Sequence, residues 1–471
     1  MSSFKPVVIG GGPAGISAAM ALAEQNISSL IMEKDRQVGG LCKTVEYQGY
    51  RCDIGGHRFF SKNREIQEIW SRTLGQEFLT RTRLSRIYYR GKFFYYPLRI
   101  GNALLGLGPM ESMKIISSYF ISRVFPSKPE ISFEDWVSNR FGKVLYNIFF
   151  KTYTEKVWGI PCTTLSADWA AQRIRNLSLG SALLNALGIM KGGKVASLIE
   201  NFQYPRLGPG QMYEAMARRI ADKGGEIRLG QEVTEILYEQ NLVKAVRTTA
   251  RNNGQRVPCS HCFSSMPITE LVQKMRPHAP DKVIDASLSL RYRSIITVNL
   301  LFNKATALPD NWIYLHSPEV KAGRIQLYGN WSPAMVPHFA ESSSIGFEYF
   351  CFEGDNFWNL SDDDLISQAL KDLLQLGFYN KDDFQDGFVV RYAKAYPMYE
   401  DGYEKHLTII KDWLSQFSNL YCIGRYGQFR YNNMDHSMIT GILAVRRMLG
   451  EDVDHWSVNA EGEYLEEKSS H

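Results

Sequence analysis

The strongest constraint on the fold is a glycine-rich loop near the amino terminus. The segment VVIGGGPAG contains Gly10, Gly12 and Gly15 in the pattern GxGxxG. A short β-branched run precedes this loop, a compact helix is expected over Ile16–Glu24, and a second strand over Ser29–Glu33. In such a unit the free N–H groups at the start of the helix stabilise a pyrophosphate. We therefore expect a Rossmann-type dinucleotide-binding domain.

The three glycines and one acidic residue have separate roles in this interpretation. Gly10 allows the tight turn, Gly12 lets the backbone approach a pyrophosphate, and Gly15 lets helix and strand pack closely. Glu33 ends the second strand, twenty-three residues after Gly10. A carboxylate at that point can accept hydrogen bonds from both ribose hydroxyls. A glycine-rich turn inside an ordinary core would leave Glu33 unexplained.

Two further segments favour FAD over NAD. Gly39 and Gly40 form a second glycine turn directly after the second strand. Near the other end of the chain, a strand closes at Gly424 and a helix is expected to begin near Asp435 and Ser437. The amino terminus of that helix, directed at the pyrimidine edge of a flavin, would stabilise negative charge on the reduced ring. The alternative for Asp435 and Ser437 is helix capping alone.

Length and charge limit the classes of function. The chain has 471 residues, of which 44% are apolar and 22% charged, so two or three globular lobes are expected. The net charge of +5 comes from scattered basic residues, which argues against nucleic acid and suits an anionic small molecule. No apolar stretch of membrane-spanning length lacks charges, so we expect no transmembrane segment, while loose contact with a membrane face stays open.

Cysteine usage indicates a reducing compartment. Seven cysteines are spread over the chain, and no secretory signal precedes the first strand, so we expect a cytoplasmic protein with free thiols. Cys259 and Cys262 form a CxxC pair, but no second ligand pair follows at zinc-site spacing. We therefore expect no metal site.

The pattern of strands and helices predicts an α/β fold with a discontinuous Rossmann-type FAD-binding domain. A helical lobe and an antiparallel-sheet lobe are inserted into that domain. The sheet lobe, which binds substrate in this interpretation, contains the alternating segments Ile295–Phe302 and Ile345–Phe352. The expected boundaries are 1–97, 202–275 and 415–455 for the FAD-binding domain, 98–201 for the helical lobe, 276–414 for the sheet lobe, and 456–471 for a polar tail.

Four further segments make a family resemblance specific. With the amino-terminal loop, GGHRFF (Gly55–Phe60), Tyr153–Arg173, Trp312–Pro333 and GRYGQFRYNNMDHS (Gly424–Ser437) resemble UDP-galactopyranose mutase, particularly its eukaryotic-type branch. They occur in the family's order and cover the chain from end to end. The wider superfamily, which includes protoporphyrinogen oxidase and amine oxidases, shares the flavin motifs but not the segments Tyr153–Arg173 and Trp312–Pro333.

The resemblance implies an isomerase that interconverts the pyranose and furanose forms of a nucleotide-diphosphate sugar, with a UDP-galactose-like substrate. In that family N5 of the reduced flavin attacks the anomeric carbon and displaces the nucleoside diphosphate, with no net redox change. This activity serves cell-surface polysaccharide biosynthesis. NAD(P)H is a candidate transient reductant of the FAD, although the sequence holds no second dinucleotide loop. The oligomeric state is left open.

Three catalytic residues are implied by the resemblance. His57 would lie beside the flavin N5, and the alternative for it is a hydrogen-bonded core histidine. Arg173 and Arg324 match two arginines that grip the substrate diphosphate. Planar guanidinium groups pair bidentately with phosphate oxygens and neutralise charge on a departing diphosphate.

The resemblance also implies a cofactor site and a substrate pocket. Arg83 matches an arginine at the flavin edge, and Tyr96 matches a nucleoside-binding Tyr-Pro step. The implied cofactor-binding residues are Gly10, Gly12, Gly15, Glu33, Gly39, Gly40, Gly56, His57, Arg83, Val233, Gly424, Arg425, Asp435, His436 and Ser437. The implied substrate-binding residues are Tyr96, Arg99, Trp158, Arg173, Trp312, Tyr314, Arg324, Tyr396 and Tyr431; tyrosine suits this role because it joins a flat apolar face to a polar tip.

The chain departs from the family pattern near the nucleoside site. Leu98 and Arg99 stand where the eukaryotic-type branch has an aromatic residue and a glutamine, and the region around Asn201 has no clean match to a phosphate-contacting asparagine. These departures leave the base and the sugar open. Two other functions stay possible: an FAD-dependent oxidase or dehydrogenase of the protoporphyrinogen oxidase or amine oxidase type, and a flavin-bearing scaffold without activity. Paired diphosphate-binding arginines distinguish the mutase from both.

Overall fold

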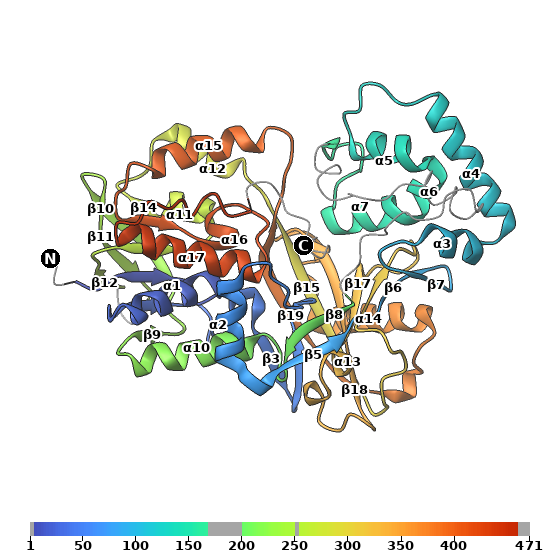
Figure 1. The fold of residues 1–471 in the computed structure, drawn as a ribbon, viewed down its shortest axis with the longest axis horizontal. Helices are drawn as coiled ribbons and strands as arrows, with labels where there is room; N and C mark the ends of the chain where they lie inside the picture. Colours follow the sequence, from blue (N-terminus) through green and yellow to red (C-terminus); the bar gives the residue numbers. More distant parts are fainter. Residues whose placement is uncertain (1–3, 168–199, 250–253, 460–471) are drawn as a thin grey trace.

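The computed structural model describes residues 4–167, 200–249 and 254–459. Figure 1 shows three regions: layered helices and strands that include both ends of the described chain, a large sheet beside them, and a separate group of helices at the far side. The fold is α/β, as the sequence predicted, with a Rossmann-type core and inserted lobes.

The Rossmann-type core is a five-stranded, all-parallel sheet. Its strand order is β20 (Leu420–Cys422), β13 (Cys262–Ser264), β1 (Val7–Ile9), β2 (Leu30–Met32) and β9 (Glu226–Arg228). Helix α1 (Pro13–Glu24) begins three residues before the expected position. It can begin there because Pro13 tolerates the first helical position, where no N–H partner is needed.

The core sheet is covered on both faces, as the alternation of side chains along each strand requires. Val8 packs with helices on one face, whereas Val7 and Ile9 pack in a second cluster on the other face. The first face carries α1, α2 (Arg64–Leu74), α10 (Gly210–Asp222) and α17 (Met434–Met448). The second carries α11 (Ile268–Lys274), α12 (Asp281–Leu288), α15 (Tyr403–Leu414) and a small sheet.

The small sheet contains a hairpin around Asn241, where the sequence predicts one because the strand pattern QEVTEI (Gln231–Ile236) comes just before it. Gln240 and Asn241 both have positive φ, 49° and 58°, which suits a two-residue hairpin turn. The strand order is β12 (Gln255–Pro258), β11 (Leu242–Thr248), β10 (Val233–Glu239) and β14 (Met275–Arg276). Val233, one of the implied cofactor-binding residues, is the first residue of β10 and is buried.

A seven-stranded mixed sheet forms the second region. Its order is β19 (Phe384–Pro397), β15 (Tyr292–Phe302), β18 (Ser343–Cys351), β17 (Arg324–Leu327), β16 (Trp312–Leu315), β6 (Ser85–Tyr89) and β7 (Lys92–Tyr95). Strand β15 is buried at every position because α14 (Asp362–Leu376) covers one face, while Leu41 and Ile54 pack on the other. Residues 85–95 were predicted to belong to the FAD-binding domain; they join this sheet because β6 pairs with β16 in parallel. The domain boundaries stay a prediction.

Short elements connect these regions. Strands β3 (Thr44–Tyr47) and β4 (Tyr50–Asp53) form one ribbon, and β5 (Phe78–Thr82) and β8 (Asn201–Pro205) form another. Single turns of helix complete them: α13 (Tyr328–Trp331), α16 (Gly424–Gly427), η1 (Gly40–Cys42), η2 (Gly75–Glu77), η4 (Pro333–Met335) and η5 (Lys381–Asp383).

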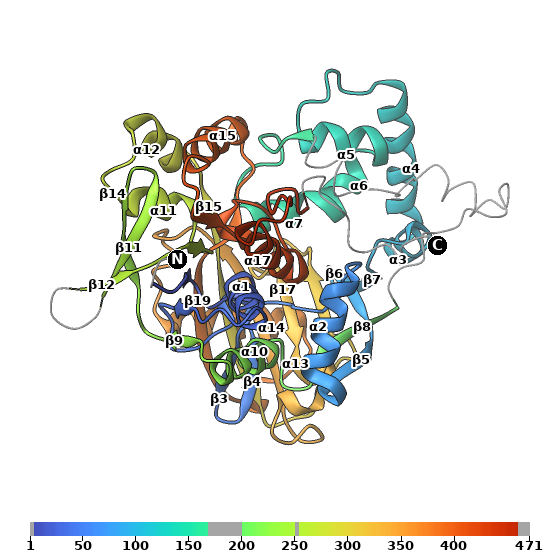
Figure 2. The same ribbon diagram turned by 60° about the vertical axis from the view of Figure 1, so that its left-hand side comes forward.

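The third region is helical, as the sequence predicted for part of residues 98–201. It contains α3 (Ile100–Leu107), α4 (Pro109–Val124), α5 (Phe133–Phe141), α6 (Lys143–Tyr146), a π-helical turn (Asn147–Lys151) and α7 (Thr152–Trp158). Figure 2 shows α4, α5 and α6 standing apart from the Rossmann-type core. No described helix is both long and apolar enough to cross a bilayer. The seven cysteines are buried free thiols, and within residues 4–167, 200–249 and 254–459 no cluster of metal-ligating side chains is found.

Candidate FAD and substrate site

Two glycine loops touch at the end of the core sheet. Gly10 has φ +96°, and a Cβ on Gly15 would lie 1.9 Å from the carbonyl oxygen of Gly10. The N–H of Gly39 donates to Gly11 O at 2.8 Å, and a Cβ on Gly40 would lie 3.1 Å from the Gly12 Cα. A Cβ on Gly15 or Gly40 would crowd this backbone, so glycine at these positions lets the two loops pack closely together.

Glu33 is fixed beside the first loop. Its Oε2 accepts from the Gly11 N–H at 2.6 Å, and its Oε1 accepts from the Asp35 N–H at 2.8 Å. Burial raises the pKa of this carboxyl, while the two backbone hydrogen bonds oppose that shift. Each carboxylate oxygen has a second lone pair, so Glu33 can still accept from ribose hydroxyls. That contact stays a prediction.

Helices α1 and α17 both begin beside the first glycine loop, and neither has a capping side chain. Gly12 precedes α1, and the side chain of Asn433, which precedes α17, makes no capping hydrogen bond. The first N–H groups of both helices therefore suit an anionic group. Asp435 accepts from the Ser61 hydroxyl at 2.8 Å through Oδ2, while Oδ1 is buried without a hydrogen-bond partner among the described residues. The first N–H groups of α1 and α17, together with the glycine loops, fit the phosphates and ring edge of FAD.

A buried ion pair lies under the loop that carries His57. The sheet register sets Arg324 of β17 directly opposite Glu348 of β18. Arg324 donates to Glu348 Oε2 from Nε at 2.8 Å and from Nη2 at 2.5 Å, and Gln326 donates to Oε1 at 2.6 Å. Burial opposes the charge on Arg324, but Glu348 together with the neighbouring tyrosines outweighs burial and raises the pKa of the guanidinium. A Cβ on Gly56 would lie 3.0 Å from the Gln326 amide, so the loop rests on this network.

Arg324 and Arg425 converge on one pair of tyrosines. Arg324 Nη2 donates to the Tyr396 hydroxyl at 3.3 Å. Tyr396 stacks on Tyr431 at 5.8 Å between ring centroids, and the Arg425 guanidinium lies over both rings, at 5.2 Å and 4.3 Å. The Nε of Arg425 is buried and has no hydrogen-bond partner within the described ranges. The structure thus brings together four predicted residues: three come from two of the family segments, and the fourth is Tyr396.

His57 lies close enough to both arginines to be affected by their charges. Burial and the positive charges of Arg425 and Arg324 lower the pKa of His57 to about 4. Its Nδ1 contacts the Gly55 carbonyl oxygen at 3.2 Å. Because a carbonyl oxygen only accepts, Nδ1 carries the proton and Nε2 of the neutral ring is an acceptor.

Aromatic rings extend the site along β16. Tyr96 and Tyr314 lie 4.2 Å apart, and the Arg83 guanidinium lies over Tyr96 at 5.7 Å and over Trp312 at 5.4 Å. Trp158, at the end of α7, is buried in the same apolar cluster as Tyr314 and Trp312. These aromatic side chains connect the helical region with the part of the site that contains Arg324 and Arg425.

One predicted substrate residue is not part of this group, and another cannot be placed. Arg99 is exposed before α3, and its guanidinium lies over the ring of Tyr95, at 5.0 Å, instead of over Tyr96. Arg173 lies outside the described residues. The roles of both stay predictions.

Asp53 fixes the start of the loop that carries His57. Its carboxylate accepts from the Thr44 hydroxyl at 2.8 Å and from the Tyr204 hydroxyl, and its carbonyl accepts from the Tyr328 hydroxyl at 2.7 Å. Burial raises the pKa of Asp53 to about 7, against the two side-chain hydrogen bonds. The carboxyl is therefore half neutral near pH 7.

We expect Asp53→Asn to change the pH dependence of stability. Since the folded pKa is raised from 3.8 to about 7, the stabilisation from a neutral carboxyl is full below pH 4 and is lost as the pH rises through 7. Between pH 4 and 8 the wild type should lose on the order of 3 kcal/mol relative to the variant. Denaturant unfolding at both pH values measures this difference, and Asp363→Asn on the exposed face of α14 is the control. Equal pH profiles for wild type and Asp53→Asn would contradict the raised pKa.

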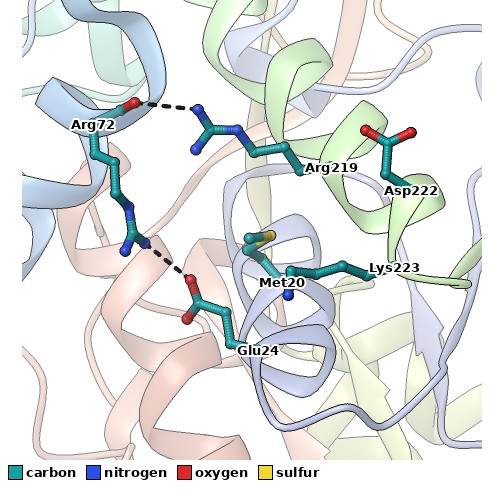
Figure 3. Close-up of a pocket in the computed structure, with 6 residues that line it drawn as sticks. All are labelled: Met20, Glu24, Arg72, Arg219, Asp222 and Lys223. Atoms are coloured by element: carbon teal, nitrogen blue, oxygen red, sulfur yellow. Dashed lines mark hydrogen bonds and ion pairs between the residues drawn. The ribbon is translucent and has the colours of Figure 1, made fainter.

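A separate surface pocket lies away from these residues. It is lined by Met20, Glu24, Arg72, Arg219, Asp222 and Lys223 (Figure 3). Arg72 donates to Glu24 at 2.9 Å, and Arg219 donates to the Arg72 carbonyl oxygen at 3.2 Å. These contacts hold α1, α2 and α10 together, and the lining contains no predicted site residue.

Comparison with known proteins assigns the family. The model of the family described as flavin containing amine oxidoreductase matches residues 13–449, which is most of the chain. The chain belongs to this family. Membership of this family implies that the chain binds FAD, and the glycine loops with the two helix termini stay the predicted site for it.

Individual relatives of this flavoprotein include both mutases and an oxidase. A dTDP-fucopyranose mutase from Escherichia coli is 28% identical over 164 residues, which are 33% of this chain and 42% of that protein. The crystal structure of reduced UDP-galactopyranose mutase superposes with a TM-score of 0.84 at 22% identity, covering 98% of both chains. Putrescine oxidase bound to putrescine gives 0.62 at 14% identity, covering 95% of this chain and 99% of that one. The chain spans about half the length of the curated relatives it matches. The resemblance to mutase-like flavoproteins is thus confirmed, while the structural likenesses show the fold alone.

Several residues of the candidate site were not predicted from the sequence. Glu348 and Gln326 support Arg324, and Tyr153 lies edge-on to Tyr314 at 5.4 Å and stacks on His316 at 4.8 Å. Glu348 did leave a signal, because it is the one charged residue in the apolar strand SSIGFEYFC. A lone buried carboxylate in a strand requires a paired cation.

Proposed function

We infer that this flavoprotein is a mutase that interconverts the pyranose and furanose rings of a nucleotide-diphosphate sugar. The observation that carries the inference is an excess of buried positive charge. Arg324 is paired with Glu348, whereas Arg425 lies over two tyrosine rings and its Nε has no partner among the described residues. An unneutralised guanidinium in a buried site requires an anion, and a diphosphate beside a negatively charged reduced flavin supplies one.

The side chains of the site have separate roles in this proposal. Bound in its reduced form, the flavin would supply the nucleophile that displaces the diphosphate from the sugar. Arg324 and Arg173 hold the diphosphate and stabilise its charge as it departs. His57, neutral because its pKa is lowered to about 4, offers Nε2 as a hydrogen-bond acceptor to the cofactor. Tyr314, Tyr396 and Tyr431 bind the sugar and phosphates through their rings and hydroxyls.

A net oxidation is the second candidate, and the family match to flavin containing amine oxidoreductases favours it. A protonated amine is a cation, and Arg324 and Arg425 would repel it unless it entered neutral. The charge of the site therefore supports the mutase over an amine oxidase.

Turnover that requires a reduced flavin tests the proposal. The dithionite-reduced and the air-oxidised protein are incubated separately with UDP-galactofuranose, and the nucleotide-sugars are separated by chromatography. We expect ring interconversion only after reduction. Arg324→Lys, which keeps the charge but not the planar fork, should lower kcat/KM by at least about tenfold. Oxygen consumption with an amine or porphyrinogen, without interconversion, would instead establish an oxidase.

A further inference from the structure

Helix α7 is the part of the helical region that meets the large sheet. Both views place it on the side of that region nearest β15 and β17 (Figure 1 and Figure 2). The helix ends at Trp158, one of the predicted substrate residues, and Gly159 follows it with φ +68°. The carbonyl groups in the last turn of a helix have no partner within the helix, so another group has to bind them.

Arg293, near the start of β15, binds these carbonyl groups. Its Nε donates to Val157 O at 3.1 Å, and its Nη2 donates to Lys156 O at 3.4 Å and to Phe350 O of β18 at 2.9 Å. Arg293 is only 6% exposed. A cation at the carboxyl end of a helix is also favoured by the helix dipole. The guanidinium of Arg293 therefore joins the end of α7 to two strands of the sheet.

The glycine after α7 leaves room for this arginine. A Cβ on Gly159 would lie 2.3 Å from Cζ of Arg293 and 2.5 Å from both of its Nη atoms. The positive φ of Gly159 alone could be adopted by asparagine, but any side chain at this position would displace the guanidinium. The Trp-Gly step at the end of α7 thus needs glycine because Arg293 fills the space beside it.

Lys156 makes the reciprocal contact from α7 to the sheet. Its Nζ donates to three carbonyl oxygens of the turn between β16 and β17: Leu315 O at 2.9 Å, Ser317 O at 2.8 Å and Ala322 O at 3.2 Å. Burial lowers the pKa of Lys156 to about 8, so most of this amine stays charged at neutral pH. Two cations thus cross the junction in opposite directions, and each binds main-chain carbonyl groups on the other side.

We propose that Arg293 and Lys156 are positioning residues that fix the end of α7 on the sheet and so hold Trp158 in the substrate site. The sheet register sets Arg293 opposite Tyr396 of β19, which Arg324 also contacts. One guanidinium therefore links the helix that carries Trp158 to the strand that carries Tyr396. The role of Trp158 toward substrate rests on the proposed function. A displacement of about 1 Å in such a site can lower turnover about a hundredfold.

Hydrogen exchange of the full-length FAD-loaded protein, measured by mass spectrometry, tests these contacts without a substrate. We expect Arg293→Met and Lys156→Met each to speed exchange of the α7 amides at least about tenfold, because the helix loses a contact that closes its end. Arg291→Met is the matched control. Arg291 lies over the same Phe352 ring as Arg293, at 4.4 Å against 4.3 Å, but it is 49% exposed and pairs with Glu400. Unchanged exchange in α7, or equally faster exchange in α1 of the core, overturns the proposal.

A double variant tests whether Gly159 and Arg293 act together. Gly159→Ala should also speed exchange in α7 about tenfold, because its Cβ displaces the guanidinium. In the Arg293→Met background the same alanine should add less than about threefold, since methionine lacks the three atoms that the Cβ meets. Effects that multiply fully would mean that alanine acts through φ alone, and they would overturn the proposed contact.

Binding of UDP to the dithionite-reduced protein tests the consequence for the site. Arg293→Met and Lys156→Met should each raise the dissociation constant at least about tenfold, with an unchanged flavin-to-protein absorbance ratio. Arg293→Lys keeps a cation but not the planar fork, so its affinity should lie between the two. Wild-type affinity in both methionine variants overturns the proposal. If the wild type itself binds no UDP, the proposed function fails, and the exchange experiment alone decides whether Arg293 and Lys156 hold α7.

Discussion

Replacing Glu348 with alanine is expected to lower the free energy of unfolding by about 3–5 kcal/mol, because it leaves a buried arginine without its counter-charge. The Glu348 side chain is fully buried and accepts from both Arg324 and Gln326. The Arg324 side chain is only 21% exposed, so without Glu348 most of it would be desolvated with no carboxylate beside it. Denaturant unfolding of the FAD-loaded protein measures the loss. The variant should also lose mutase turnover, since Arg324 is no longer held at Tyr396.

Glu353→Ala is the matched control for this change. Glu353 lies two residues after the same strand, is 52% exposed, and pairs with Lys394 at 3.7 Å. An exposed pair contributes at most about 1 kcal/mol, so the control should unfold close to the wild type. Equal stability of Glu348→Ala and Glu353→Ala would mean that the Arg324 pair is solvated, and the charge argument for a diphosphate would lose its basis.

The Rossmann-type core could be predicted because its signals are local. The glycine loop, the strand before it and the hairpin at Asn241 each depend on residues close in the sequence, and all three are present. The start of α1 was placed three residues late, because glycine and proline were read only as loop residues. Proline at a helix start removes an N–H that needs no partner, so it extends the helix instead of ending it.

The pairing of distant strands could not be predicted. Residues 85–95 gave no sign that β6 would join β16, more than two hundred residues later. Parallel pairing leaves no turn signal between the strands and is specified only by burial in the finished sheet. The same holds for Glu348, whose partner Arg324 is set by the register of β17 on β18.

The site was predicted in part. Family motifs led to Arg324, Tyr396, Tyr431 and Arg425, and the structure gathers these four. Arg99 was proposed from a departure in one motif, without a second contact, and its guanidinium lies over the exposed ring of Tyr95 instead. A site residue proposed only from its position in one motif is a weaker prediction than residues from several segments that suit the same ligand.

Gly15→Ala is expected to abolish flavin binding and to destabilise the protein by several kcal/mol. The new Cβ would lie 1.9 Å from the Gly10 carbonyl oxygen and 3.1 Å from a Val8 methyl group. Gly10 cannot move away freely, because it holds φ +96° and its N–H donates to Met32 O at 2.8 Å. The clash therefore separates α1 from the core sheet. The flavin-to-protein absorbance ratio and thermal unfolding measure the two losses.

Gly12→Ala separates cofactor binding from folding. A Cβ on Gly12 would meet the Gly40 Cα at 3.7 Å, which is an ordinary contact, and Gly12 has φ −78°, which alanine adopts without strain. The protein alone thus tolerates alanine at position 12, and only a ligand against the loop needs glycine there. We expect the apo form of Gly12→Ala to unfold like the wild-type apo form, with FAD affinity lowered at least about tenfold. Gly101→Ala, in α3 with no atom near its Cβ, is the control and should retain FAD and gain up to about 1 kcal/mol. Full FAD affinity in Gly12→Ala would mean that the cofactor does not approach this loop, and the arrangement proposed for the whole site would fail with it.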